Sequence, residues 1–424
     1  MGKASHDWLS GLPDGLLTLI FEAVGRISRR DLCSVSRLNK RIHALADSIL
    51  YRTVLFNSHD HHIVFRESLN RRPRRGSAIQ DITVKLNETS LELSQLLLEG
   101  AEHVGAAAAL SPTSPLAPAL PEVDGLSHAI ATMSNLETLD IAVPAKLLHG
   151  IGTLLNGPFD LACLRSCTLF YQCPGDQYWD LRENIHMFAH PTLEHLVIRR
   201  AKLDYRGFDL MAQPHETGLR TLHLLECDIN DDALSDILEF PAGLREFVMT
   251  QLDEPTPPLE ESSDSMFDYM LALQSAAHSL ERITVDFPTL AGRKALRMRD
   301  FTALKTLRLN WDYQLFGKSS KKPRLHSVGM PPQLETLEFF NAIGTDDEVT
   351  DLLENMISSR SVVAEKLQRV IVTQGDESEV PKVIVDACKE QGLPLDIIGA
   401  MEDGDAYPES PGKLGDTKAD IDFY

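Results

Sequence analysis

The clearest pattern in the chain is a short hydrophobic repeat that returns nine times between residues 136 and 372. In each copy a leucine is followed, after two residues, by a second apolar residue and, after one more, by a third. The copies start at Leu136, Leu164, Leu193, Leu219, Leu244, Leu280, Leu304, Leu334 and Leu367, at intervals of 24 to 36 residues. Apolar residues two apart lie on the same side of a strand. The pattern therefore predicts nine short strands, each with one side in a core and the other toward solvent.

Segments with a helical spacing of apolar residues lie between these strands. They cover residues 145–155, 180–189, 231–240, 266–277, 346–358 and 380–391. Two of them follow a residue that often caps helices, Asn230 and Thr345. The alternation predicts an α/β fold whose strands stack into an open, curved parallel sheet with the helices on its convex side. Weaker strand patterns at Ile82 and Leu393 extend the array at its two ends.

This part of the chain resembles the leucine-rich repeats of intracellular proteins, whose units are roughly 20 to 29 residues long. The resemblance covers residues 136 to about 374 and implies a right-handed solenoid. The asparagine or cysteine that follows the strand in this family is matched by Cys227 and, less closely, by Asn341. A doubly wound α/β enzyme is the alternative, since it also alternates strands and helices. Against it, no strand is followed by a Gly-rich phosphate loop or a nucleophile elbow.

A separate helical unit is predicted at residues 8–56. Three apolar stripes follow one another there, over residues 12–24, 32–45 and 49–54, and they predict three short helices. Pro13 suits the first turn of the first helix, because the N–H that proline lacks has no helical partner at that position. About 45 residues form only a small core. We therefore expect this unit to pack against a neighbouring part of the chain or a partner.

Several residues of this unit match a known motif: Leu12-Pro13 with Leu16, Leu17 and Ile20, then Asp31-Leu32, Val35-Ser36-Arg37-Leu38-Asn39, Leu45-Ala46 and Leu50-Tyr51-Arg52. With them the unit resembles the F-box family and looks most like its fungal members. Ile42 departs from the pattern, because the family often has an aromatic residue there. The resemblance implies docking on a Skp-type adaptor and, through it, on the cullin of a ubiquitin ligase.

By the same resemblance, apolar side chains of these helices contact the adaptor, and some of them also pack the unit itself. They are Leu12, Pro13, Leu16, Leu17, Ile20, Leu32, Val35, Leu38 and Leu45. Exposed apolar patches usually mark a partner. The alternative is that the helices only cover the open end of the repeat array.

A target protein would bind the concave side of the array, which the third, fifth and seventh residues of each copy should face. Aromatic and arginine side chains dominate measured interface energies. The candidate target-binding residues are Phe170, Tyr171, Arg199, Arg282, Arg308, Trp311 and Phe340, of which Tyr171 and Trp311 stand at strand ends. Four acidic side chains meet four arginines on this face, so it is nearly neutral.

The net charge changes sign along the chain. The whole chain carries −21, yet residues 1–77 hold 13 Lys and Arg against 7 Asp and Glu. Nucleic-acid binding needs a basic face, which the acidic remainder does not offer. No apolar stretch approaches the roughly 20 residues of a membrane helix. Six cysteines are too few for a disulfide scaffold, and we expect a cytoplasmic or nuclear protein without a cofactor.

Four further segments differ from the two predicted domains. Residues 57–77 form a basic connector. Its cluster at 71–75 is an exposed loop, a nuclear localisation signal or a phosphate contact. A smaller basic cluster lies at 321–324. Within the solenoid, predicted at 78–400, two Pro-rich insertions near 105–125 and 253–265 are expected to be disordered. Residues 401–424 form an acidic tail that should be flexible.

The chain offers little catalytic chemistry. Cys163, Cys167, Cys173, His186 and His190 imitate a zinc site, but Cys167 takes the fourth place of its repeat, which faces the core. The cluster at residues 59–62 is expected in an exposed loop. Neither a zinc-protease motif nor a phosphate loop is present.

The sequence therefore predicts a non-catalytic protein of one of two kinds. It is a substrate-recognition subunit of a Skp–cullin–F-box ubiquitin ligase, which would act by holding a target near the transfer step, or a leucine-rich scaffold outside any ligase.

Overall fold

The computed structural model of the chain describes residues 11–56, 59–86, 125–145, 151–154, 161–204, 216–252, 254–287, 298–310, 329–342, 347–374 and 379–399. The chain forms two compact units, one up to Leu164 and the other from Arg165 onward. The boundary between them lies inside the predicted repeat array. The predicted insertion at 105–125, apart from its last residue, and the predicted tail at 401–424 lie outside the described residues.

The first unit begins with three helices, α1 (Asp14–Ile27), α2 (Arg29–Ser36) and α3 (Lys40–Leu50). The side chain of Ser28 accepts a hydrogen bond from the backbone N–H of Asp31 at 3.2 Å, and that of Asn39 accepts one from Ile42 at 2.8 Å. Each bond satisfies a donor that has no partner inside the helix. The apolar stripe over residues 32–45 is therefore two helices, because Asn39 caps a new one.

The third predicted helix is partly wrong. Its stripe ends in a strand, β1 (Thr53–Phe56), which pairs in parallel with β2 (Asp81–Lys85). Thr, Val and Phe favour strands, and here the pairing with β2 makes residues 53–56 a strand and not a helix. Between these strands lie α4 (His59–Arg71) and the 3-10 helix η1 (Pro73–Ala78), so the predicted connector is largely helical and residues 59–62 begin a helix rather than a loop.

The described part of the first unit also contains α6 (Gly125–Ala131), β3 (Thr138–Pro144) and α7 (Ile151–Leu154). The strand β3 pairs in parallel with β2. Helix α7 lies within the helix predicted at 145–155, of which residues 146–150 and 155 are outside the described residues, and α6 packs against α4.

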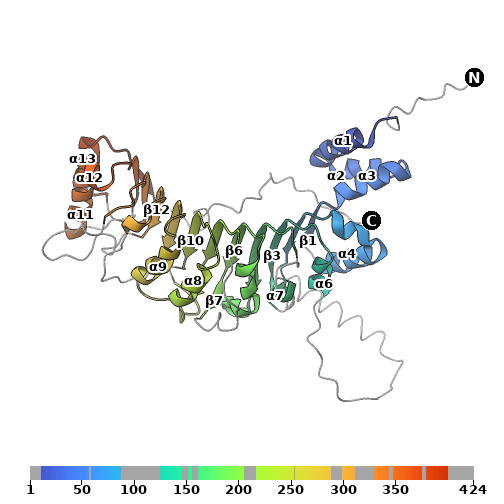
Figure 1. Ribbon diagram of the computed structural model, residues 1–424, viewed down its shortest axis with the longest axis horizontal. Coiled ribbons are helices and arrows are strands. Elements are labelled where there is room, and N and C mark those ends of the chain that lie inside the picture. The colour runs from blue at the N-terminus through green and yellow to red at the C-terminus, as the bar shows by residue number, and fades with distance from the viewer. Residues whose placement is uncertain are drawn as a thin grey trace, which may run out of the picture. The chain divides into compact units, whose positions relative to one another are not determined.

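A parallel sheet of 12 strands runs through the described chain in the order β1-β2-β3-β4-β6-β8-β10-β11-β12-β13-β14-β15, which is also their order in the sequence (Figure 1). The strands that the second unit contributes to this sheet are β4 (Ser166–Gln172), β6 (His195–Arg199), β8 (Thr221–Leu225), β10 (Glu246–Thr250), β11 (Arg282–Asp286), β12 (Thr306–Leu309), β13 (Thr336–Ala342), β14 (Arg369–Gln374) and β15 (Leu395–Gly399). All nine strands predicted from the repeat are confirmed, and β2 and β15 confirm the two weaker patterns.

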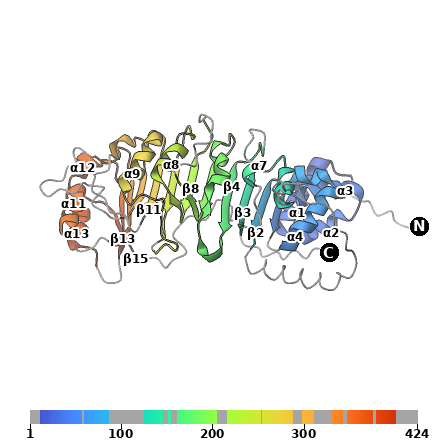
Figure 2. The same ribbon diagram turned by 90° about the horizontal axis from the view of Figure 1, so that it is seen from below.

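Three short strands form a second parallel sheet, β5 (Trp179–Asp180), β7 (Ala201–Leu203) and β9 (Asp228–Ile229). Among the described residues of the second unit, the helical segments are η2 (Pro174–Asp176), η3 (Leu181–Ala189), α8 (Asp231–Ile237), α9 (Met266–Ala272), η5 (Leu273–Ala276), η6 (Met298–Asp300), α11 (Asp347–Ser358), α12 (Arg360–Val363) and α13 (Lys382–Glu390). Helices α8 and α9 lie side by side in both views (Figures 1 and 2).

The core of the sheet consists of the repeated apolar positions. Every leucine that opens a copy, and every residue at the fourth and sixth places, is at most 2% exposed. Neighbouring strands are in register, so that equivalent places stand beside one another; Leu196 pairs with Leu222, and Leu222 with Phe247. Alternation along each strand therefore decides which side chains form the core, as the sequence predicts.

The acidic loop predicted as a disordered insertion is held in place over residues 254–265. The buried carboxylate of Asp228 accepts hydrogen bonds from the backbone N–H groups of Glu260 at 3.0 Å and Ser262 at 2.8 Å, and a longer one from Glu261. The hydroxyl of Tyr269 accepts one from Ser263 and donates to the carbonyl of Ile229. These anchors replace the hydrophobic core that the loop lacks.

Candidate protein-binding surfaces

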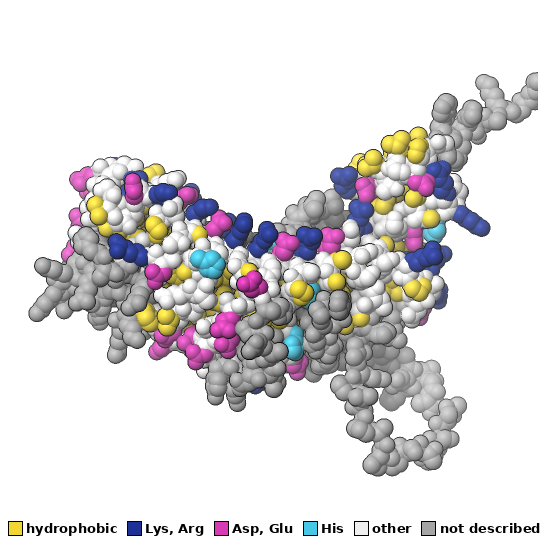
Figure 3. Space-filling model, viewed as in Figure 1, with side chains coloured by type: hydrophobic (Ala, Val, Ile, Leu, Met, Phe, Trp, Pro, Cys, Tyr) yellow, Lys and Arg dark blue, Asp and Glu magenta, His cyan; other side chains and the backbone are white. Residues whose placement is uncertain are grey.

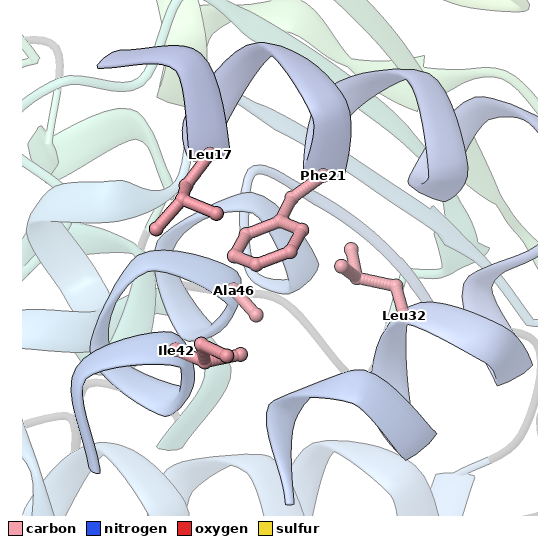
Figure 4. Packing of buried hydrophobic residues seen from close by; sticks show 5 residues of the cluster. All are labelled: Leu17, Phe21, Leu32, Ile42 and Ala46. Carbon is pink, nitrogen blue, oxygen red and sulfur yellow. The ribbon is translucent and has the colours of Figure 1, made fainter. Parts of the chain in front are cut away.

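The three N-terminal helices share a core of five side chains, Leu17, Phe21, Leu32, Ile42 and Ala46, each at most 1% exposed (Figure 4). They come from all three helices and point toward one another. Two of the predicted adaptor contacts, Leu17 and Leu32, are therefore buried and serve the unit itself. Ile42 fills the place where an aromatic residue was expected.

Helix α1 carries a second apolar face, which we call the α1 surface: Leu16, Leu19, Ile20 and Ile27, exposed by 50%, 61%, 40% and 87%. Residues 16, 20 and 27 are four and seven apart, which places them on one side of the helix. Figure 3 shows a group of hydrophobic side chains over this end of the first unit. Large apolar side chains gathered at one exposed place usually mark a binding site.

The other predicted adaptor contacts divide between exposed and half-buried positions. Pro13 and Leu38 are exposed, and Leu12, Val35 and Leu45 are half-buried against the helical core. The prediction missed Leu19 and Ile27, although their spacing from Leu16 in the sequence would have revealed them.

Arginine side chains fasten the helices to one another. Arg41 contacts Asp14 at 2.7 Å and donates to the carbonyl of Leu12, which ties α3 to the start of α1. Arg29 donates to the carbonyls of Leu50 and Thr53, at 2.6 and 2.8 Å. These two bonds join α2 to the end of α3 and the first residue of β1.

The basic cluster at residues 71–75 is largely occupied by contacts within the first unit. Arg75 makes a bidentate pair with Asp47, lies 4.3 Å from the ring centre of Tyr51, and is 17% exposed. Arg71 pairs with Glu67 at the surface. The smaller cluster at 321–324 lies outside the described residues.

The second candidate surface lies on the side of the sheet opposite to the core of the repeats. The third, fifth and seventh places of each copy form rows across it; the row of fifth places runs through Thr168, Val197, His223, Val248 and Thr284. Of these, residues 197, 223, 248 and 284 are at most 6% exposed. The middle row therefore offers less surface than the sequence predicts.

Four arginines of the second unit stand on this side of the sheet, and each is paired with a carboxylate of a neighbouring repeat. The pairs are Arg199 with Glu226, Arg282 with Glu246, Arg308 with Glu338 and Arg369 with Asp396. We call this surface the arginine face. The pairing agrees with the near-neutral balance expected from the sequence.

Two arginines of the face also lie over aromatic rings. Arg308 gives Glu338 two hydrogen bonds of 2.9 Å and lies 4.9 Å from the ring centre of Phe340. Arg199 lies 5.7 Å from the ring centre of Phe170. Both distances are within the roughly 6 Å of a cation–π contact. The structure thus brings predicted target-binding residues together in two pairs, Arg199 with Phe170 and Arg308 with Phe340.

Glu226 is a residue of the arginine face that the repeat pattern does not predict. It follows β8 with a φ of 56°, and its carboxylate contacts Arg199 at 3.2 Å and Arg200 at 3.0 Å. Few residues other than glycine adopt a positive φ. Because this conformation ends the alternation of the strand, the side chain reaches a surface that its position in the repeat does not predict.

Glu246 lies between two basic side chains. Nε2 of His223 is 3.2 Å from its Oε1, and Arg282 donates to its Oε2. These contacts lower the pKa of Glu246 to about 2, the hydrogen bond with His223 having the largest effect. The carboxylate therefore keeps its charge at any physiological pH.

One predicted target-binding residue, Tyr171, does not join the face. Tyr171 is only 4% exposed and packs edge-on against Trp179, with 4.7 Å between the ring centres. It stands one residue after Phe170, and alternation along β4 turns it to the core side, so this prediction is wrong. Trp311 lies outside the described residues.

The cysteines do not form a site in the described part of the chain. Cys167 is buried, as its place in the repeat predicts, and Cys163 is exposed. Burial raises the pKa of the Cys227 thiol to about 12, and its Sγ lies 3.3 Å from the carbonyl oxygen of Leu225. Among the described residues, no group of three or more His, Cys, Asp or Glu side chains could hold a metal ion.

Within the described ranges, no helix is both long enough and apolar enough to cross a membrane. A scan of protein-family models gives no match to the chain, and no curated protein sequence matches it. The candidate surfaces therefore rest on the chain's own residues.

Proposed function

We propose that the chain is the substrate-recognition subunit of a Skp–cullin–F-box ubiquitin ligase. In this proposal the N-terminal helices form an F-box that docks on a Skp-type adaptor, and the 12-stranded sheet belongs to a leucine-rich-repeat solenoid that holds a target protein. The chain would supply no catalytic group, because bringing the target close to the transfer step is sufficient.

The observation that carries the proposal is that α1 has two apolar faces. Leu17 and Phe21 fill the core, while Leu16 and Ile20 are half exposed on the other face. A helix that only covers the end of a sheet would need a single apolar face. The second face is expected if a partner protein buries it.

The repeat architecture and the surrounding charge also support the proposal. Strands in chain order with buried leucines at equivalent places are typical of leucine-rich repeats. In the same helical unit, Arg30 of α2 and Arg37, which follows α2, are exposed. An acidic adaptor surface would be attracted to them, which accelerates association more than it raises affinity.

Co-expression with a Skp-type adaptor tests the proposal. The wild-type chain should elute with the adaptor in size-exclusion chromatography, and a Leu16→Asp, Ile20→Asp variant should elute alone. The matched control is Val362→Asp, at a 76% exposed position of α12, which should keep the complex. If the wild-type chain and adaptor elute separately, the scaffold outside any ligase becomes the better assignment.

A further inference from the structure

We infer that the arginine face binds an extended, acidic segment of a partner protein. The inference rests on the proposed function only in treating the bound segment as part of a ligase target. A scaffold outside any ligase could bind the same segment. It identifies the chemistry of the ligand, which the proposal for the adaptor does not address.

The first observation is that the arginine side chains of three pairs are more exposed than the carboxylates they contact. In the pairs Arg199–Glu226, Arg282–Glu246 and Arg308–Glu338 the arginine side chains are 45%, 55% and 22% exposed, against 28%, 17% and 15% for the carboxylates. The outer charges of these three pairs are therefore positive, whereas Arg369 and Asp396 of the fourth pair are equally exposed, at 50% and 51%. The whole chain carries −21. Figure 3 shows Lys and Arg side chains in a row along this part of the molecule, with Asp and Glu side chains between some of them.

The second observation is that the arginines are held in place yet retain donors. A guanidinium group has five N–H donors. Arg308 directs Nε and Nη2 to Glu338, and Arg199 directs Nη2 to Glu226, so Nη1 of each lies outside these bonds. Contact with Phe340 or Phe170 further restricts each side chain. Little side-chain entropy is then lost when a carboxylate of a ligand binds.

The third observation is the spacing of the two arginine–aromatic pairs. Arg199 is on β6 and Arg308 on β12, with β8, β10 and β11 between them. Neighbouring strands lie about 4.8 Å apart, so the two arginines are separated by about 19 Å across the sheet. An extended peptide advances about 3.3 Å per residue, so its acidic residues should be about six positions apart. Arg282, on β11, lies between the two.

The carboxylates of the face favour such a peptide over a nucleic acid. Glu226, Glu246 and Glu338 lie close beneath the arginines and would repel a continuous row of phosphates. Binding of a nucleic acid also needs a surface with a clear excess of positive charge. Acidic residues spaced along a peptide can meet the arginines one at a time.

Fluorescence anisotropy with the full chain tests the inference directly. The probe is a labelled peptide of glycine and serine with two glutamates separated by five residues, and the control peptide has glutamine at both places. At low ionic strength the acidic peptide should bind at least about tenfold more tightly than the control peptide, since a hydrogen bond to a charged group contributes about 1.5 to 3 kcal/mol.

Variants in the protein give the matching comparison. Arg199→Gln with Arg308→Gln should weaken binding of the acidic peptide about tenfold or more. Lys382→Gln with Lys389→Gln removes the same charge from α13 and should change binding less than about twofold, because surface charges at a distance are screened.

A variant with the opposite expected effect separates binding from misfolding. Glu338→Gln removes the negative charge that competes for Arg308 and leaves only one acceptor oxygen, so it should strengthen binding of the acidic peptide several-fold, which a damaged fold would not do. Equal binding of the two peptides, unchanged binding by the double arginine variant, or binding only of a phosphoserine peptide or of a single-stranded oligonucleotide would overturn the inference. No adaptor is present in these measurements, so their failure is distinct from failure of the proposed ligase role.

Discussion

Arg75 holds Asp47 through two parallel hydrogen bonds, from Nε to Oδ2 at 3.1 Å and from Nη2 to Oδ1 at 2.9 Å. The pair joins η1 to α3, and both side chains are at most 20% exposed. A bidentate pair of low exposure contributes more to stability than a surface pair does.

Replacing Arg75 by alanine should therefore lower the free energy of unfolding by about 2 kcal/mol, because Asp47 loses a charged partner in a poorly hydrated place. Arg71→Ala is the control, since Arg71 and Glu67 are 80% and 63% exposed, and its cost should be under about 0.5 kcal/mol. Urea unfolding measures both values. Equal effects of the two substitutions would contradict a special role for Arg75.

The anchor of the acidic loop can be removed at one residue. Asp228→Ala leaves the backbone N–H groups of Glu260 and Ser262 without their acceptor, so hydrogen exchange at these amides should accelerate about tenfold or more. Mass-spectrometric exchange over residues 254–265 reports the change. Asp264→Ala, at an exposed position of the same loop, should leave the exchange pattern as it is. An unaltered pattern in the Asp228 variant would show that other contacts hold the loop.

Glu246 gives the stability a defined dependence on pH. Its pKa falls from the usual 4.5 to about 2 in the folded state, so between these values the unfolded chain binds more protons. The stabilisation that its charge provides is complete above about pH 4.5 and is lost as the pH falls toward 2. The difference in unfolding free energy between wild type and Glu246→Gln should shrink over that interval.

Chemical denaturation of both proteins at a series of acidic pH values checks this prediction. Glu390→Gln, an exposed substitution on α13, should follow the wild type at every pH. A constant difference between wild type and the Glu246 variant would mean that the carboxylate gains nothing from His223 and Arg282.

The two apolar faces of α1 should respond differently to truncation. Phe21→Ala removes a ring that is 1% exposed and should cost about 3 to 5 kcal/mol, enough to unfold a small helical unit. Leu19→Ala, at a 61% exposed position, should change stability by less than about 0.5 kcal/mol. Circular dichroism melting of the two variants measures the contrast. A large loss of stability in the Leu19 variant would place that side chain in the core.

The strands were predictable because the signal for them is local. A leucine such as Leu222 is separated by one residue from Leu224, and this spacing alone puts both in the core. The same rule, applied from Leu169 to the residue two positions further along β4, would have placed Tyr171 in the core. Its assignment to a binding surface failed because aromatic character was given more weight than alternation.

The remaining features depend on contacts that are distant in the sequence. Asp228 holds backbone groups 32 to 34 residues away, and no pattern in the loop itself announces that acceptor. Glu226 reaches the arginine face because its φ is positive, which the repeat does not encode. For the N-terminal helices, hydrophobic spacing identifies Leu16 and Phe21 equally well. Only packing shows that one is half exposed and the other belongs to the core.

The two hydrogen bonds of Arg29 make the connection between α3 and β1 rigid. They hold the carbonyls of Leu50 and Thr53, and only two residues separate α3 from β1. A partner that covers Leu16 and Ile20 is therefore connected to β1 and β2 through a rigid junction and not through a flexible linker. Lengthening the chain between Tyr51 and Thr53 would change where a bound partner is presented without altering any residue that binds it.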